Sequence, residues 1–172
     1  MNIIIVFMSV YVTRVFGLTE SQIFNLMLFS IFFAIAGSLL SGYISDHIGH
    51  KRGLIIVFVL WGICLLSGAL ARSMLFYRIL GPLVGVALGS TWVVSRALVI
   101  RIVPAEKIGQ VFGLFFLISL LSGAIGTFFW SALLWFLSPL GELGYRIALL
   151  SLLFFLLPGF VYLLRIRVDL NF

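Results

Sequence analysis

The stretch that decides the fold is GYISDHIGHKRG, residues 42–53, which separates two long apolar runs. Gly49 has no Cβ, so the chain can take a backbone conformation there that reverses its direction quickly. Asp46 falls at the edge of the preceding apolar run. A carboxylate at a membrane edge is costly unless it is paired or lies at the positive end of a helix, and Lys51 and Arg52 offer the opposite charge. On charge alone, the stretch is a solvated basic loop between two membrane segments.

The composition around this stretch excludes a water-soluble protein. The chain has 172 residues, of which 63% are hydrophobic and 9% are charged, and its mean hydropathy is +1.31. A soluble domain carries about 25% charged residues, so this chain could not solvate its own surface. A membrane-spanning helix needs about 20 apolar residues, so the length allows about six crossings. We therefore expect an all-α integral membrane protein with six transmembrane helices and no soluble catalytic domain.

The apolar segments form one predicted transmembrane domain over residues 1–172. The first segment is short for a membrane crossing. Thr19 and Gln22 have the spacing of a capping box, which predicts that a new helix starts there. No segment alternates strictly between polar and apolar residues, which argues against a transmembrane barrel. The predicted helices cover about 3–16, 22–44, 54–71, 75–102, 108–137 and 145–164.

Basic residues predict the orientation in the membrane. One set of loops and the tail hold six of them, namely Lys51, Arg52, Arg101, Lys107, Arg165 and Arg167. The opposite loops hold four, namely Arg14, Arg72, Arg78 and Arg146. The positive-inside rule then places the 45–53 loop and the C-terminus in the cytoplasm. We expect the membrane to be the plasma membrane. This distribution also explains the net charge of +6 without a nucleic-acid partner.

Small residues recur at helical spacing in several segments. Gly81, Gly85 and Gly89 stand at every fourth position of the fourth segment. Small residues on one face let membrane helices approach closely, so we expect packing seams. The alternative is that they line a pathway along which helices slide. The second and fifth segments carry similar sets, namely Gly37, Ser41 and Gly42, and then Gly109, Gly113, Ser119, Ser122, Gly123 and Gly126.

Few polar side chains fall inside the segments. Arg96 lies five residues before Arg101, and an intramembrane ionisable residue is either functional or extends its charge to the headgroups. No carboxylate falls near the middle of a segment, so proton coupling through an acid would need a residue elsewhere. His47 and His50 are three residues apart and lack the additional acidic or cysteine ligands of a metal site. We expect neither a metal nor a cofactor. Candidate residues of a substrate pathway, or of hydrogen bonds between helices, are Ser38, Ser90, Thr91 and Ser122.

The spacing within residues 42–53 resembles the signature loop of the major facilitator superfamily. That loop has a glycine, an aspartate and a second glycine, here Gly42, Asp46 and Gly49, followed by a basic pair, here Lys51 and Arg52. In the superfamily it follows the second helix and recurs in a weaker form after the eighth helix. Histidines replace two of the usual basic residues here, which fits the weaker copy.

Other stretches look like the second half of such a transporter. Residues 95–104, with Gly109 and the pair Phe112-Gly113, look like the tenth helix and the loop after it. Residues 17–22 resemble the external loop before the eighth helix. Among the branches of the superfamily, the chain resembles the vacuole effluxer-like, or autophagy-related amino-acid effluxer, family. The resemblance implies the C-terminal six-helix half of a twelve-helix carrier, beginning partway into the seventh helix.

This resemblance implies transport of a small solute, such as amino-acid efflux, by alternating access. The loop would act as a latch in which Asp46 holds a helix end of the other half, supported by a charge network of Lys51, Arg52, Arg96 and Arg101. The implied partners are the lipid bilayer, a small-molecule substrate and a second six-helix half. That half would be a separate chain, a missing N-terminal half or a second copy.

Three other readings compete with a carrier. A membrane-embedded enzyme lacks its acid and base groups here, because both histidines fall in one loop and only one aspartate lies at a membrane edge. The membrane substrate-binding subunit of an energy-coupling-factor vitamin transporter is also small and six-helical, but it does not need the Gly–Asp–Gly–basic loop. A non-transporting truncated membrane protein is the third reading.

Overall fold

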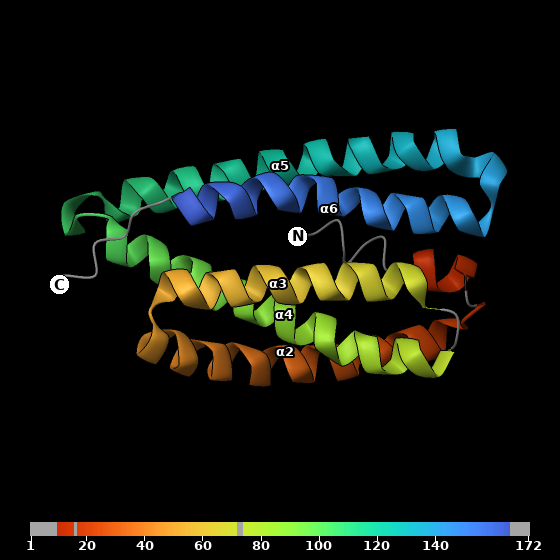
Figure 1. Cartoon of the computed structure of the whole chain (residues 1–172), viewed down its shortest axis with the longest axis horizontal. Helices are drawn as coiled ribbons and strands as arrows, with labels where there is room; N and C mark the ends of the chain where they lie inside the picture. The colour runs from red at the N-terminus through yellow and green to blue at the C-terminus, as the bar shows by residue number, and fades with distance from the viewer. Residues whose placement is uncertain (1–9, 16, 72–73, 166–172) are drawn as a thin grey trace.

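The computed structural model describes residues 10–15, 17–71 and 74–165, and for residues 74–77 it describes the backbone alone. Residues 10–15 are helical. Five long helices follow (Figure 1), namely α2 (Glu20–Ile48), α3 (His50–Leu70), α4 (Met74–Ile102), α5 (Ile108–Leu137) and α6 (Glu142–Arg165). Short 3₁₀ turns, η1 (Ala105–Lys107) and η2 (Ser138–Leu140), flank α5.

The expected all-helical membrane class is confirmed. Within the described ranges, five helices are long and apolar enough to cross a membrane, and no strand occurs. The helices α2 and α4 each have 29 residues, which is about 43 Å at about 1.5 Å per residue. They are therefore longer than a hydrocarbon core of about 30 Å. Of the first expected segment, 3–16, only residues 10–15 lie within the described part of the chain.

The helix α2 starts as the capping-box spacing predicts. The backbone N–H of Thr19 donates to Oε1 of Gln22 at 3.1 Å, and the helix begins at Glu20. This hydrogen bond satisfies one of the backbone groups that a helix start leaves without a helical partner. The confirmed cap fixes the beginning of the first long described helix.

The junction between α2 and α3 differs from the expected polar loop. The helix α2 continues to Ile48 and α3 begins at His50, so Gly49 alone separates them. Its φ of 93° is strained for residues with a Cβ, which glycine lacks. The Gly49 N–H still donates to the Ser45 carbonyl at 2.9 Å, and its carbonyl accepts from the Gly53 N–H at 2.9 Å. Polar residues there are accommodated on helix ends because the backbone hydrogen bonding is almost uninterrupted.

The glycines of α4 form a seam against α2, which confirms the packing prediction for this segment. Gly85 contacts the backbone carbonyl of Ser30, and Gly89 contacts that of Ala34. The Ser90 hydroxyl, which is buried, donates to the Gly37 carbonyl at 3.3 Å across the seam. The two helices are therefore in backbone contact, as small residues permit in membranes.

The glycines of α5 have a different environment. A Cβ built at Gly109, Gly113 or Gly123 would meet nothing within 4 Å among the described residues. The helix α5 is held mainly by α6, where the Trp130 indole N–H donates to the Ala148 carbonyl at 2.8 Å. The expected seam along this segment therefore has no partner helix within the described part of the chain.

The helices α3 and α6 cap each other at opposite ends. Near the start of α3, Lys51 Nζ donates to the Leu164 carbonyl in the last turn of α6 at 3.1 Å. Near the start of α6, Arg146 donates to the Ala69 carbonyl in the last turn of α3 at 3.0 Å. A cation is favourable at the negative end of a helix dipole, and each bond uses a carbonyl that the helix end leaves without a partner. The two antiparallel helices are thereby clamped in register.

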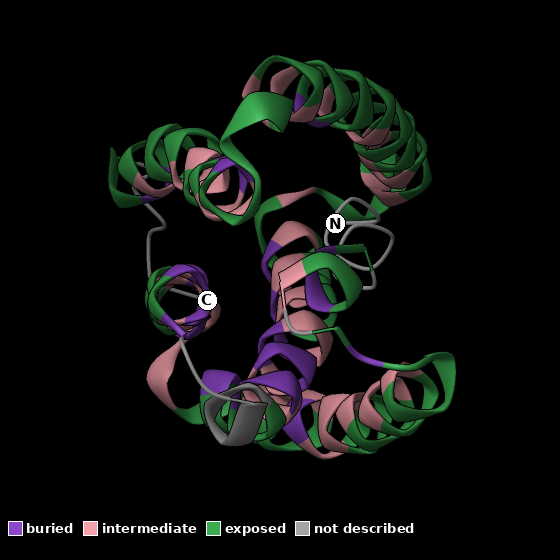
Figure 2. Ribbon diagram, turned by 90° about the vertical axis from the view of Figure 1, so that its right-hand side faces the viewer, coloured by how far each residue is buried: buried purple, intermediate pink, exposed green. Residues whose placement is uncertain are grey.

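Buried residues gather around α3 and α4. Among the described residues the apolar core is built from these helices, with Tyr11, Val12, Leu18 and Leu163 packed against them. Trp130 is the buried residue of α5, and most of that helix is exposed (Figure 2). Exposed apolar side chains on such helices suit a lipid or protein environment rather than water.

Candidate functional site

The junction of α2 and α3 gathers the polar groups of the signature-like stretch. Asp46 lies in the last turn of α2, and its side chain is 69% exposed, whereas the side chain of His50 is 11% exposed. His50 Nδ1 lies 3.9 Å from Asp46 Oδ1. This is the ion pair of Asp46 within the described ranges. A pair with one exposed partner contributes little stability, so most of the Asp46 carboxylate surface is available to another group.

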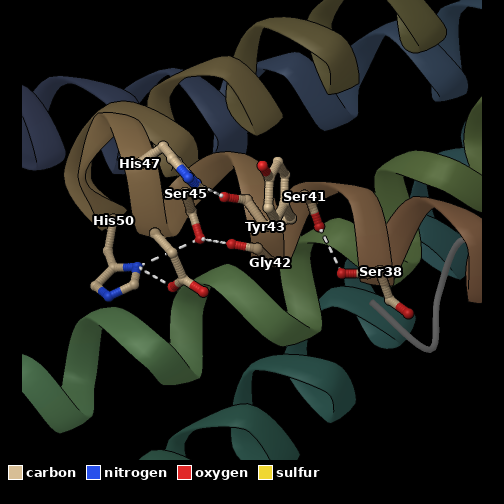
Figure 3. A network of polar contacts seen from close by, with 8 residues as sticks. Ser38, Ser41, Gly42, Tyr43, Ser45, His47 and His50 are labelled. Carbon is tan, nitrogen blue, oxygen red and sulfur yellow. Dashed lines mark hydrogen bonds and ion pairs between the residues drawn. The ribbon is translucent and has the colours of Figure 1, made fainter.

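Ser45 determines how His50 is oriented at this junction (Figure 3). The Ser45 hydroxyl is fully buried and donates its hydrogen to the Gly42 carbonyl at 2.9 Å. Its oxygen can therefore only accept from His50 Nδ1, which lies 3.3 Å away. This assigns the Nδ1 proton of His50. Ser45 itself fits closely against α3, because a Cβ at Gly53 would lie 2.8 Å from the Ser45 Cβ.

The basic residues of the predicted latch and charge network occupy separate places. Lys51 reaches the end of α6, and Arg52 is exposed at the start of α3. Arg101 is exposed in the last turn of α4. The guanidinium carbon of Arg96 lies 5.7 Å from the centre of the Trp92 ring, which is a cation–π arrangement. The predicted network around Asp46 stays a prediction.

A cleft of about 580 Å³ runs along the α2–α4 pair. Within the described part of the chain, four side chains with polar atoms line it, namely Ser30, Ser38, Trp92 and Arg96. The other lining residues are apolar or glycine and come from both helices and from Val12. The volume falls in the range of about 300–1,000 Å³ that is typical of small-molecule sites.

The predicted pathway residues are distributed over three environments. Ser38 lines the cleft, and its hydroxyl donates to the Ile35 carbonyl at 2.7 Å. Ser90 is buried in the glycine seam. Thr91 accepts from the Trp61 indole N–H at 2.9 Å and so joins α4 to α3. Ser122 lies on the exposed surface of α5. Ser90 and Thr91 thus make contacts between helices, which was the second reading of these polar residues.

Sequence reasoning did not join Trp92 and Arg96 to Ser30 as one site. A signal was present, because positions 85, 89, 92 and 96 share one helical face. The glycines at positions 85 and 89 are expected to face another helix. Trp92 and Arg96 lie one and two turns further along the same face. Within the described part of the chain, His, Cys, Asp and Glu do not form a group of three or more that could hold a metal ion.

Comparison with known proteins gives a family match over nearly the whole chain. The family model described as Major Facilitator Superfamily matches residues 1–170. An uncharacterized protein of Aquifex aeolicus is 25% identical over 168 residues, which are 98% of this chain and 43% of that protein. A Na(+), Li(+), K(+)/H(+) antiporter of Planococcus maritimus is 29% identical over 159 residues, which are 90% of this chain and 37% of that protein. No solved structure matches significantly.

Proposed function

Because the chain belongs to the major facilitator superfamily, we propose that it is the C-terminal six-helix half of a carrier that moves a small solute by alternating access. Membrane transport in general follows from the family. The family match over residues 1–170 and the five long apolar helices support a carrier, and the resemblance of residues 42–53 to the weaker copy of the signature loop favours its C-terminal half. In such carriers two halves rock about a site near the middle of the bilayer.

A second six-helix half is the proposed partner. The chain spans less than half the length of the two relatives described above, at 43% and 37%. Along α5, Gly109, Gly113 and Gly123 face open space among the described residues, and small residues suit close approach of another helix. The second half is either part of the same protein, a separate chain or a second copy, and the reconstitution below distinguishes a second copy from a half of different sequence.

The α2–α3 junction is the proposed latch between halves. The exposed Asp46 carboxylate lies beside the single-residue break at Gly49. A group that binds the partner half in only one state stabilises that state over the other. Because Lys51 already caps α6, the junction is fixed to its own half while Asp46 faces outward. The basic residues at this end support a cytoplasmic location of the latch and the C-terminus, in a plasma-membrane protein.

Two resemblances suggest which solute the carrier moves. The resemblance to vacuole effluxer-like proteins suggests amino-acid efflux, and the Planococcus maritimus relative is named as a cation/proton antiporter. The comparisons give no support to the vitamin-transporter subunit or to a non-transporting protein. These resemblances suggest amino acids and monovalent cations as solutes, and Arg96 in the cleft wall adds organic anions. Each class is accessible to the same transport assay.

Reconstitution into proteoliposomes tests the half-carrier. The chain is reconstituted alone and with its complementary half, and the efflux of radiolabelled amino acids, ⁸⁶Rb⁺ and decanoate is measured. We expect efflux of one solute class only when both halves are present. Efflux by the chain alone, at a rate that is linear in its concentration, would contradict the need for a second half. A rate that rises with the square of the concentration identifies a second copy as the partner.

Cysteine labelling tests the latch. In a Cys64→Ala background, a cysteine placed at Ser38 reports access to the cleft from each side of the membrane. Asp46→Asn in the complete assembly should raise labelling from the cytoplasmic side, because the cytoplasm-closed state loses a contact. Glu20→Gln is the matched control, since it removes an equal charge from the opposite end of α2. Equal labelling in all three proteins would exclude the latch role.

A further inference from the structure

The cleft along α2 and α4 has an asymmetric chemistry. Its walls are almost entirely apolar, and Arg96 is the one charged group among the described residues that line it. No acidic side chain belongs to the described residues that line it. Carboxylate and carbonyl oxygens are the ligands that alkali and alkaline-earth cations prefer, so these walls are poorly suited to a bare cation.

The two serine hydroxyls of the cleft offer acceptors only. The hydroxyl of Ser30 donates to the Leu26 carbonyl at 2.8 Å, and that of Ser38 donates to the Ile35 carbonyl at 2.7 Å. Each serine has one hydrogen to donate, and in both it is already used within α2. The donors on the cleft wall are therefore concentrated at the end where Arg96 and Trp92 lie.

Arg96 lies at a membrane depth where pairing with an anion would stabilise its charge. It stands six residues before Ile102, the last residue of α4, which is about 9 Å along the helix axis. If a helix of about 43 Å is centred on a core of about 30 Å, Arg96 lies about 2 Å inside the hydrocarbon boundary. A guanidinium there gains from a paired anion. The Trp92 ring holds the guanidinium over its face at 5.7 Å and is itself half exposed.

We propose that the α2–α4 cleft binds an amphipathic organic anion, with its anionic group on Arg96 beside Trp92 and its apolar body along the glycine seam. The volume of about 580 Å³ suits a molecule with a medium-length hydrocarbon body. That this anion is the transported substrate rests on the proposed function, whereas its binding to the cleft does not.

Binding of radiolabelled decanoate to the purified chain in phosphatidylcholine nanodiscs tests the site. We expect saturable binding that unlabelled decanoate displaces and that decanol and decylamine, of equal chain length, displace at least tenfold less well. Arg96→Gln should weaken decanoate affinity about tenfold or more, because a charge-assisted hydrogen bond is lost. Arg96→Lys should lose less, since it keeps the charge.

Arg78→Gln is the matched control, because it removes an equal charge from α4 at a residue outside the cleft lining. The inference is overturned if Arg96→Gln binds decanoate like the unaltered chain, or if decanol competes as well as decanoate. A second arm adds phosphatidylglycerol to the nanodiscs. If this lipid removes decanoate binding in the unaltered chain, the occupant is a membrane lipid and the substrate assignment fails.

The transport assay keeps this inference separate from the proposed function. Arg96-dependent decanoate binding without efflux of any solute by the complete assembly would refute transport and leave the site intact. Efflux that is unaffected by Arg96→Gln, in a protein that does not bind decanoate, would refute the site and leave transport intact.

Discussion

Replacing Gly85 by alanine tests the backbone contact between α2 and α4. A Cβ built at this position overlaps the Ser30 carbonyl oxygen and lies 2.9 Å from its carbon. The favourable carbon–carbon separation is about 3.5–4.0 Å, so the carbonyl carbon alone requires the helices to part by roughly 0.6 Å, and the nearer oxygen requires more. The atoms in the way belong to the backbone of α2, which cannot rotate aside as a side chain can.

The cost of this movement can be worked out from its parts. Overpacking of this kind costs about 1–3 kcal/mol, and a gap of about 0.5–1 Å forfeits a quarter to a half of each dispersion contact along the seam. The Ser90–Gly37 hydrogen bond, already 3.3 Å long, is also stretched, at about 0.6 kcal/mol for such bonds in membranes. Alanine stabilises the helix by up to about 1 kcal/mol relative to glycine, which offsets part of this cost. We expect a net loss of about 1–3 kcal/mol.

The assay is unfolding of the purified chain in mixed micelles, titrated with sodium dodecyl sulfate and followed by far-UV circular dichroism. Gly62→Ala on α3 is the matched control, because a Cβ there meets nothing within 4 Å, and it should be neutral or slightly stabilising. If Gly85→Ala and Gly62→Ala shift the unfolding midpoint equally, the backbone contact does not hold α2 to α4.

Four further substitutions can be measured in the same titration. Gly49→Ala should destabilise the chain by about 1–3 kcal/mol, because a φ of 93° with a ψ of 138° is a backbone conformation that residues with a Cβ rarely adopt. An unchanged midpoint would mean that the junction is not held in this conformation. Lys51→Met and Arg146→Met should each cost about 0.3–1 kcal/mol by removing a cation from a helix C-terminus. The two losses should add in the double variant. A double variant as stable as either single variant would count against two independent clamps. Trp61→Phe should cost about 1 kcal/mol by removing the donor to Thr91, and a neutral result would show that this hydrogen bond adds nothing.

Features set by local sequence were predictable. The pair Thr19 and Gln22 fixes the start of α2 through one hydrogen bond across three residues. The spacing of Gly85 and Gly89 fixes which face of α4 meets another helix. In both cases the information lies within one or two helical turns, where geometry depends on little else.

Other features depend on contacts between distant segments. The contact of Lys51 with the Leu164 carbonyl joins residues 113 positions apart in the chain, and no local pattern around Lys51 predicts it. The polar composition of residues 45–53 indicated a loop, because nothing local shows that hydrogen bonding continues through Gly49 on both sides. The small residues of α5 looked like those of α4, but a sequence does not state which helix faces a seam.

The width of the cleft and its charge depend on different residues of α4. The distance between its two walls is set where Gly85 and Gly89 contact backbone carbonyls of α2. Substitutions of other side chains leave these backbone contacts in place. The charge of the cleft is set one and two turns further along, at Trp92 and Arg96. A substitution at position 96 therefore changes which molecules the cleft attracts without changing its width. Relatives with the same glycines and a different residue there would share the separation of the two helices and differ in the charge at this end of the cleft.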